Sequence, residues 1–206
     1  AKSLAQIDQD AVDSLLTITG FDKVSLLSYG SITKAHKNIY LDFNAIAKGY
    51  AVDALAAMLQ SLGYTQFLVE VGGELFASGL HPEKAKPWRV AIDHPKQDVA
   101  RTFIATLPLQ NQGMASSGNY RKFRTDASGN YYVHTINPKT GKSVKSNILS
   151  TSVLAPTTML ADAYATALMA MPSTRGKILI ESLNEVEAMW VLAEKDSVQV
   201  MATSGF

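Results

Sequence analysis

Short strand-like runs joined by tight turns limit the possible folds of this chain most strongly. FLVEV (67–71) and ELFASGL (74–80) flank Gly72 and Gly73, a spacing that predicts a hairpin of two strands. Further strand-like runs cover residues 23–28, 31–35, 38–43, 88–93, 101–109, 131–136, 149–155, 189–194 and 198–203. Most neighbours are joined by turns and not by crossover helices. The order therefore predicts an α+β fold, a mostly antiparallel sheet packed with helices, and argues against a Rossmann-type fold.

Helical patterns occupy the remaining long segments, which are residues 9–19, 42–63, 157–171 and 173–183. Thr157 is expected to cap the third helix. In the second, apolar residues recur at helical spacing and predict a buried stripe, made of Ala51, Ala54, Leu55, Met58 and Leu59.

Composition excludes several classes of protein. A chain of 206 residues is expected to form one compact domain over residues 1–206. The net charge of +1 gives no reason to expect nucleic acid or an anionic membrane as a partner. The chain has no cysteine, which excludes disulfides and thiolate metal sites. Neither a signal peptide nor a bilayer-spanning apolar run is visible.

The segment from Asp42 to Tyr50 is an unusual helix start, with an acidic residue, small residues and then Lys48-Gly49. Free amides at a helix start favour an anion, and Lys48 adds a full charge, so phosphate binding has a physical basis. The alternative is that Asp42 caps the helix and Lys48 is solvated.

Gly72 and Gly73 allow the backbone to pass close to a ligand, or they simply form the turn. His134 lies at a strand end, directly before the turn signals Asn137-Pro138 and Thr140-Gly141. A histidine there suits general-base chemistry or ligand binding, although it is also a common structural donor.

The other histidines, His36, His81 and His94, have no spacing for a metal site and are expected at the surface.

Asp162 and Thr166 are four residues apart, which places their oxygens on one helix face among small apolar residues. A carboxylate, a hydroxyl and a carbonyl together suit Mg²⁺. The alternative is a water-facing Asp162 and a Thr166 bonded to its own helix carbonyls.

The order of six motifs along the chain resembles the ApbE family, the FAD:protein FMN transferases. The motifs are DFNAIAKGYAVD, VEVGGELFASG, PWRVAIDHP, MASSGNYRKF, HTINPKTGKSV and APTTMLADAYATAL. The resemblance runs from about residue 7 to the end. Members of this family are Mg²⁺-dependent exported bacterial proteins that attach FMN to Thr or Ser of partner proteins.

The resemblance implies a metal site made of the Ala45 carbonyl and the side chains of Asp162 and Thr166.

It also implies a flavin site. Asp42 is expected to contact the nucleotide and Lys48 to face its pyrophosphate. Gly72 and Gly73 border the pocket, and His134 lies in it as the catalytic residue.

The chain departs from the family pattern at three positions. It has Asn137 and Asn119 where Asp is more common, and Ser116 where Thr is frequent. The missing carboxylate at 137 is expected to change how His134 is held.

The implied reaction moves FMN from FAD to a protein hydroxyl and releases AMP. Alternatives are an FAD pyrophosphatase that yields FMN and AMP, and a non-catalytic flavin-binding module. The implied acceptor is a flavoprotein, such as a subunit of a membrane electron-transfer complex.

The implied location is the periplasm or the outer face of the inner membrane, for an exported and often lipid-anchored protein. Family members carry a further N-terminal segment, so we expect this chain to lack it and to self-associate.

Overall fold

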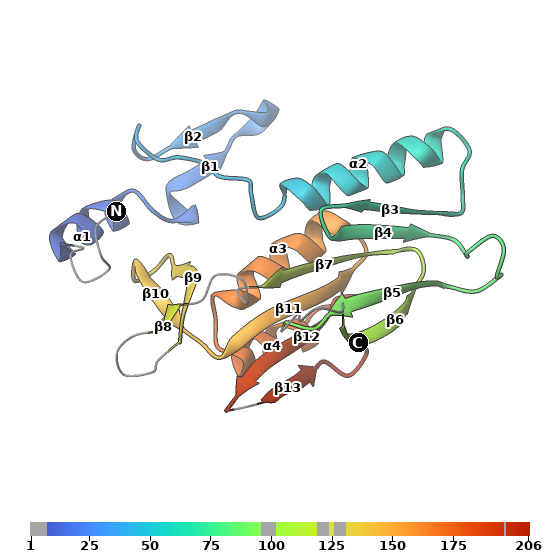
Figure 1. Ribbon diagram of the computed structural model, residues 1–206. Helices are drawn as coiled ribbons and strands as arrows, with labels where there is room; N and C mark the ends of the chain where they lie inside the picture. The colour runs from blue at the N-terminus through green and yellow to red at the C-terminus, as the bar shows by residue number, and fades with distance from the viewer. Residues whose placement is uncertain (1–7, 96–101, 119–123, 126–130, 196) are drawn as a thin grey trace.

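The computed structural model describes residues 8–95, 102–118, 124–125, 131–195 and 197–206. At its centre lies a six-stranded sheet with the order β13-β12-β11-β7-β4-β3 (Figure 1). These strands are β3 (Phe67–Val71), β4 (Glu74–Ser78), β7 (Gln112–Gly118), β11 (Ile148–Ala155), β12 (Glu187–Glu194) and β13 (Ser197–Ala202). Every pairing in this sheet is antiparallel, so the predicted α+β fold with an antiparallel sheet is confirmed.

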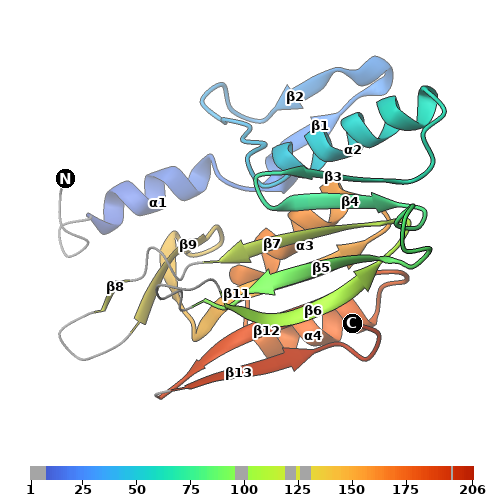
Figure 2. The same ribbon diagram turned by 45° about the vertical axis from the view of Figure 1, so that its right-hand side comes forward.

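Helices cover one face of the sheet and a second hairpin covers the other (Figure 2). The helices α3 (Thr158–Met169) and α4 (Ser173–Glu181) lie behind the strands in that view, and β5 (Trp88–Asp93) and β6 (Phe103–Leu109) lie in front. Among the described residues, no helix is long and apolar enough to cross a membrane.

The alternation of side chains along each strand builds two apolar layers. On β11, Val153 joins the cluster beneath α3 and α4, while the next residue, Leu154, joins the cluster beneath β5 and β6. The helix-side cluster contains the fully buried Trp190, Leu168 and Ile180. Each such side chain contributes roughly 1.5–3 kcal/mol relative to an exposed position.

Helix α2 (Ala47–Ser61) packs against α3, β3 and β4 through small residues. Its buried positions are Gly49, Val52 and Ala56. The predicted buried stripe is wrong, because Leu55 and Met58 are 40% and 50% exposed. Close approach to α3 requires small residues on the buried face, and the larger apolar residues therefore point outward.

The first helix and hairpin lie to one side of the main sheet (Figure 1). These elements are α1 (Gln9–Thr17), the 3₁₀ turns Phe21–Lys23 and Ser28–Gly30, β1 (Val24–Leu26) and β2 (Ile32–Lys34). The strand predicted over 38–43 is wrong. That segment is irregular, and Asp42 Oδ1 accepts a hydrogen bond from the Asn44 backbone amide at 2.7 Å, a local turn that competes with strand pairing.

A small three-stranded sheet contains β8 (Arg124–Thr125), β9 (Tyr131–Asn137) and β10 (Lys142–Lys145). The predicted turn between residues 137 and 141 is confirmed, since the Gly141 amide donates to the Asn137 carbonyl at 2.8 Å. Helix α1 packs its Val12 and Leu16 against Gly141. The strands β7, β8 and β10 were not predicted.

Candidate functional site

Three segments that are distant in sequence meet at one end of the main sheet. Ser150 of β11 pairs with Gly118 of β7, and Leu75 of β4 pairs with Met114. Continuing that second register places Gly73 level with Ser116. Gly72 and Gly73 have φ of 64° and 106°, values that favour glycine, so the predicted hairpin turn is confirmed.

The first turn of α2 lies at the same end and is held by Asp162. Helix α2 begins after Ile46, which provides no side-chain cap. Instead, the Gly49 amide donates to Oδ2 of Asp162 at 3.0 Å. Asp162 is only 3% exposed, so the water-facing alternative for this side chain is wrong.

Gly49 permits the close approach of α2 and α3. A Cβ at this position would lie 2.5 Å from the Thr158 carbonyl oxygen and 2.6 Å from Met159 Cα. Both are backbone atoms, which cannot move aside cheaply. The glycine that weakens the helix start in isolation is therefore required by the contact between the helices.

Asp53 connects the same two helices. Its Oδ1 accepts from the Thr158 amide at 2.8 Å and its Oδ2 from the Met159 amide at 2.9 Å. Thr157 is the predicted cap, and its hydroxyl accepts from the Leu160 amide at 3.2 Å. Together they bind the free amides at the start of α3, the helix that carries Asp162 and Thr166. Sequence reasoning missed Asp53, because its partners lie more than a hundred residues away.

Lys48 forms an ion pair that sequence reasoning did not anticipate. Its Nζ lies 2.5 Å from Oε1 of Glu74, whose side chain is 2% exposed, whereas that of Lys48 is 49% exposed. Burial raises the pKa of the Glu74 carboxyl above its ordinary value, and the Asp162 charge adds to this while Lys48 opposes it. The only sequence signal for Glu74 is a carboxylate directly after the glycine pair.

Thr166 lies one helix turn beyond Asp162. Its Oγ1 is 3.2 Å from the Ser117 hydroxyl, so this side chain bridges α3 and β7. Among the described residues, no group of three or more His, Cys, Asp or Glu side chains could hold a metal. A cation here would therefore depend on hard oxygens of mixed type, which Asp162, Thr166 and the carbonyl of Ala45, just before α2, fit.

Asp42 does not cap α2. Its two carboxylate oxygens accept from the backbone and side-chain nitrogens of Asn44, at 2.7 and 3.2 Å, and Asp42 is exposed. His134 lies on β9, but its side chain is outside the described part of the chain, as is Asn119.

Of the three histidines expected at the surface, His36 is exposed. His81 is not: its ring packs on Trp88 with centroids 4.8 Å apart, and its Nδ1 is buried without a partner among the described residues. The stack on an aromatic ring covers part of the His81 side chain. His94 is partly buried.

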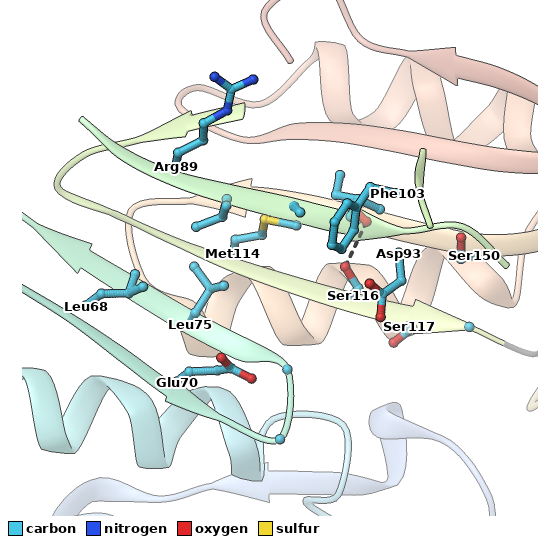
Figure 3. Close-up of a pocket in the computed structure, with 17 residues that line it drawn as sticks. Leu68, Glu70, Leu75, Arg89, Asp93, Phe103, Met114, Ser116, Ser117 and Ser150 are labelled. Carbon is cyan, nitrogen blue, oxygen red and sulfur yellow. Dashed lines mark hydrogen bonds between the residues drawn. The ribbon is translucent and has the colours of Figure 1, made fainter. Parts of the chain in front are cut away.

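A cavity of about 690 Å³ opens on the hairpin side of the sheet, at the same end (Figure 3). Apolar side chains from the main sheet and from β6 form part of its wall, namely Leu68, Leu75, Met114 and Phe103. Glu70, Arg89 and Asp93 provide charge. The Ser116 and Ser152 hydroxyls, 2.8 Å apart, provide polar groups on its floor.

Gly72 and Gly73 separate this cavity from the charged cluster. Leu75 faces the cavity, whereas its neighbour Glu74 points to the helix side and contacts Lys48. Likewise, Ser116 faces the cavity and Ser117 contacts Thr166 on α3. This end of the sheet therefore brings a cavity with apolar, charged and hydroxyl-bearing walls next to a cluster of two buried carboxylates and a lysine.

Several known proteins are similar to this chain in sequence. The chain is 38% identical to the FAD:protein FMN transferase of Haemophilus influenzae over 168 residues, which are 80% of this chain and 48% of that protein. It is 33% identical to the Vibrio cholerae protein of the same name, over 92% of this chain and 55% of that protein. The chain thus spans about half the length of these relatives.

Solved structures agree in fold. The apo form of the Pseudomonas stutzeri flavinyl transferase ApbE superposes with a TM-score of 0.83 at 32% identity, covering 97% of this chain and 60% of that one. The flavin transferase ApbE of Vibrio cholerae gives a TM-score of 0.84 at 30% identity, covering all of this chain and 64% of that one. The ApbE family model matches residues 2–190, which include the cavity and the charged cluster at this end of the main sheet. By sequence and by fold, this chain belongs to the ApbE family.

Proposed function

We propose that this protein transfers FMN from FAD to a Thr or Ser hydroxyl of an acceptor protein, in a Mg²⁺-dependent reaction that releases AMP. Relatives with 31–38% identity carry the name FAD:protein FMN transferase, and that name supports the donor and the transferred group. The observation that carries the proposal is the pair of buried carboxylates, Glu74 and Asp162, at the start of α2.

The charges at this helix start favour phosphate only together with a cation. Free amides and Lys48 attract an anion, but Glu74 and Asp162 place two carboxylates beside them, against one ammonium. Without a cation, the phosphates of a nucleotide would be repelled by the net negative charge of these three side chains. A divalent cation on Asp162, Thr166 and the Ala45 carbonyl would reverse that balance and neutralise charge on the pyrophosphate.

The neighbouring cavity suits the flavin ring system. Its volume lies within the range of roughly 300–1,000 Å³ that small-molecule sites occupy. Apolar side chains form part of its wall and hydroxyls lie on its floor, a combination that fits a flat heteroaromatic ring with polar edges. With the ring there, the phosphates extend past Gly72 and Gly73 toward Lys48, and Asp42 contacts the nucleotide.

In the proposed reaction, the acceptor hydroxyl oxygen attacks the phosphorus of the FMN half of FAD. The new phosphoester bond forms as the bond to the AMP phosphate breaks, and AMP leaves. His134 accepts the hydroxyl proton or positions the hydroxyl. Strand β9, which carries His134, lies beside the same end of the main sheet as the end of β7 (Figure 1).

Water in place of the hydroxyl would give the alternative reaction, hydrolysis of FAD to FMN and AMP. We further propose an exported location, in the periplasm or on the outer face of the inner membrane. An acceptor flavoprotein of a membrane electron-transfer complex would be within reach there.

The test uses the full-length protein with FAD, Mg²⁺ and a family-type acceptor, followed by detection of AMP and of the acceptor mass. AMP with a flavin-shifted acceptor supports the transferase. AMP with free FMN and an unmodified acceptor identifies a hydrolase, and FAD binding without AMP identifies a binding module. A reaction that proceeds equally well in EDTA would overturn the Mg²⁺ requirement.

A further inference from the structure

Glu74 has a role that the proposed reaction does not yet explain. It is 1% exposed, and only one of its oxygens is paired, with Lys48 at 2.5 Å. The other oxygen, Oε2, is buried with no hydrogen-bond partner among the described residues. Burying a carboxylate when one of its two oxygens lacks a hydrogen bond costs folding free energy, so stability alone does not explain a glutamate at this position.

The glycine turn determines where the Lys48 side chain lies. A Cβ at Gly72 would sit 3.5 Å from Lys48 Cδ and 3.8 Å from Glu74 Oε2. The lysine stem therefore runs alongside the turn, and the ion pair joins the first turn of α2 to the first residue of β4. Lys48 remains half exposed while Glu74 is enclosed, so the pair has one open side, at the ammonium.

We infer that Glu74 is a positioning residue of the site: its carboxylate holds the Lys48 ammonium at the Gly72–Gly73 turn, where the ammonium meets the phosphates of the flavin nucleotide. The inference rests on the proposed function, since it needs a nucleotide at this turn. Glu74 acts on the nucleotide only through Lys48.

Two physical arguments support this role. An ammonium has three donors, and Glu74 Oε1 occupies one, which leaves donors for phosphate oxygens. A free lysine samples many rotamers and loses that freedom when a phosphate binds it. A lysine already held by a buried carboxylate loses less, and the nucleotide binds more tightly for that reason.

The first experiment compares binding of FAD and riboflavin to the full-length protein by flavin fluorescence. Glu74→Gln keeps the side-chain volume and removes the charge. We expect it to weaken FAD binding by roughly tenfold, as the loss of one charge-assisted contact would, and to leave riboflavin binding unchanged because riboflavin has no phosphate. Lys48→Met should have the same pattern, and the double variant should be no weaker than Lys48→Met alone.

The matched control is Glu181→Gln, which makes the same change in the exposed Lys177–Glu181 pair, 3.7 Å apart. It should leave the binding of both ligands unchanged. Equal loss of FAD and riboflavin by Glu74→Gln, or additive losses in the double variant, would overturn the positioning role.

The second experiment needs no flavin. The rate of Lys48 acetylation is measured by mass spectrometry relative to the rate for Lys177. Acetylation reports on the ion pair because a lysine reacts only as an unprotonated amine that has left its carboxylate partner. Glu74→Gln should raise the relative rate several-fold, and an unchanged rate would overturn the contact itself. Failure of the unsubstituted protein to bind FAD would instead overturn the proposed function, and the labelling result distinguishes the two cases.

Discussion

At the scale of single residues, the site depends on a glycine without a side chain and on a buried carboxylate. Gly49 has no side chain where a Cβ would meet the backbone of Thr158 at 2.5 Å, and Glu74 is a carboxylate enclosed at 1% exposure. The missing side chain at Gly49 allows α2 and α3 to touch, and the Glu74 carboxylate pairs with Lys48 of α2. Each suggests a substitution whose effect on folding can be measured.

Gly49→Ala is expected to lower the free energy of unfolding by about 1–3 kcal/mol, since the added methyl overpacks the contact between α2 and α3. Urea unfolding followed by circular dichroism measures the change. Ala57→Ser, on the exposed face of the same helix, should stay within about 0.5 kcal/mol of the unsubstituted protein. Equal effects of the two substitutions would mean that the helices do not touch at Gly49.

The pH dependence of stability should differ between the unsubstituted protein and Glu74→Gln. Burial raises the folded-state pKa of Glu74 above 4.5, so the folded state binds a proton more tightly than the unfolded state does. The contribution of this group to stability is therefore fully present below 4.5 and is lost as pH rises through the folded pKa. The Glu74→Gln variant lacks this pH-dependent contribution to stability, because glutamine does not titrate.

Urea midpoints of both proteins in EDTA, between pH 4 and 8, test the expectation. The unsubstituted protein should gain stability relative to Glu74→Gln as the pH falls through this window. A difference that stays constant with pH would show that the folded-state pKa of Glu74 is not raised.

At the scale of elements, the hairpin and the helices were largely predictable from sequence, and some contacts between them were not. The glycine pair between 67–71 and 74–78 marked the β3–β4 hairpin, and the Thr157 cap marked the start of α3. Strand β7, QGMASSG, escaped prediction because its small residues carry no strand pattern.

The same limit applies to the site. The Asp162–Thr166 pair followed from helical spacing, which is a local property. Asp53 was missed because its hydrogen-bond partners lie 105 and 106 residues away in the sequence. Glu74 was missed because it becomes buried only when α2 packs on β4. The buried face of α2 was assigned wrongly for a related reason: contact with α3 selects small residues, which hydrophobicity alone does not mark.

Asp53→Ala is expected to destabilise the start of α3 and with it the fold, by about 1–2 kcal/mol, because two helix amides lose their acceptors. Hydrogen exchange of the Thr158 and Met159 amides should accelerate beyond what the global loss explains. Glu181→Ala, at an exposed helix position, is the control. Unchanged exchange at these two amides would show that Asp53 does not cap α3.

At the scale of the whole molecule, residues 8–40 contribute little to the core. Ile39 is the one buried residue among residues 8–40, and Phe21 and Leu26 are 92% and 75% exposed. The β1–β2 sheet has only two strands, and such a hairpin is marginally stable alone. Exposed apolar patches of several hundred Å² usually bind a partner or aggregate.

The 206-residue chain produced alone is therefore expected to self-associate at micromolar concentration, with a light-scattering mass above 22.2 kDa. Replacing Phe21 and Leu26 together by Ser should reduce this mass, because it removes exposed apolar area on the hairpin segment. Replacing Val200, an exposed residue on the edge strand β13, should have a smaller effect if the hairpin segment carries the contact. A stable monomer of 22.2 kDa would show that these apolar side chains need no cover.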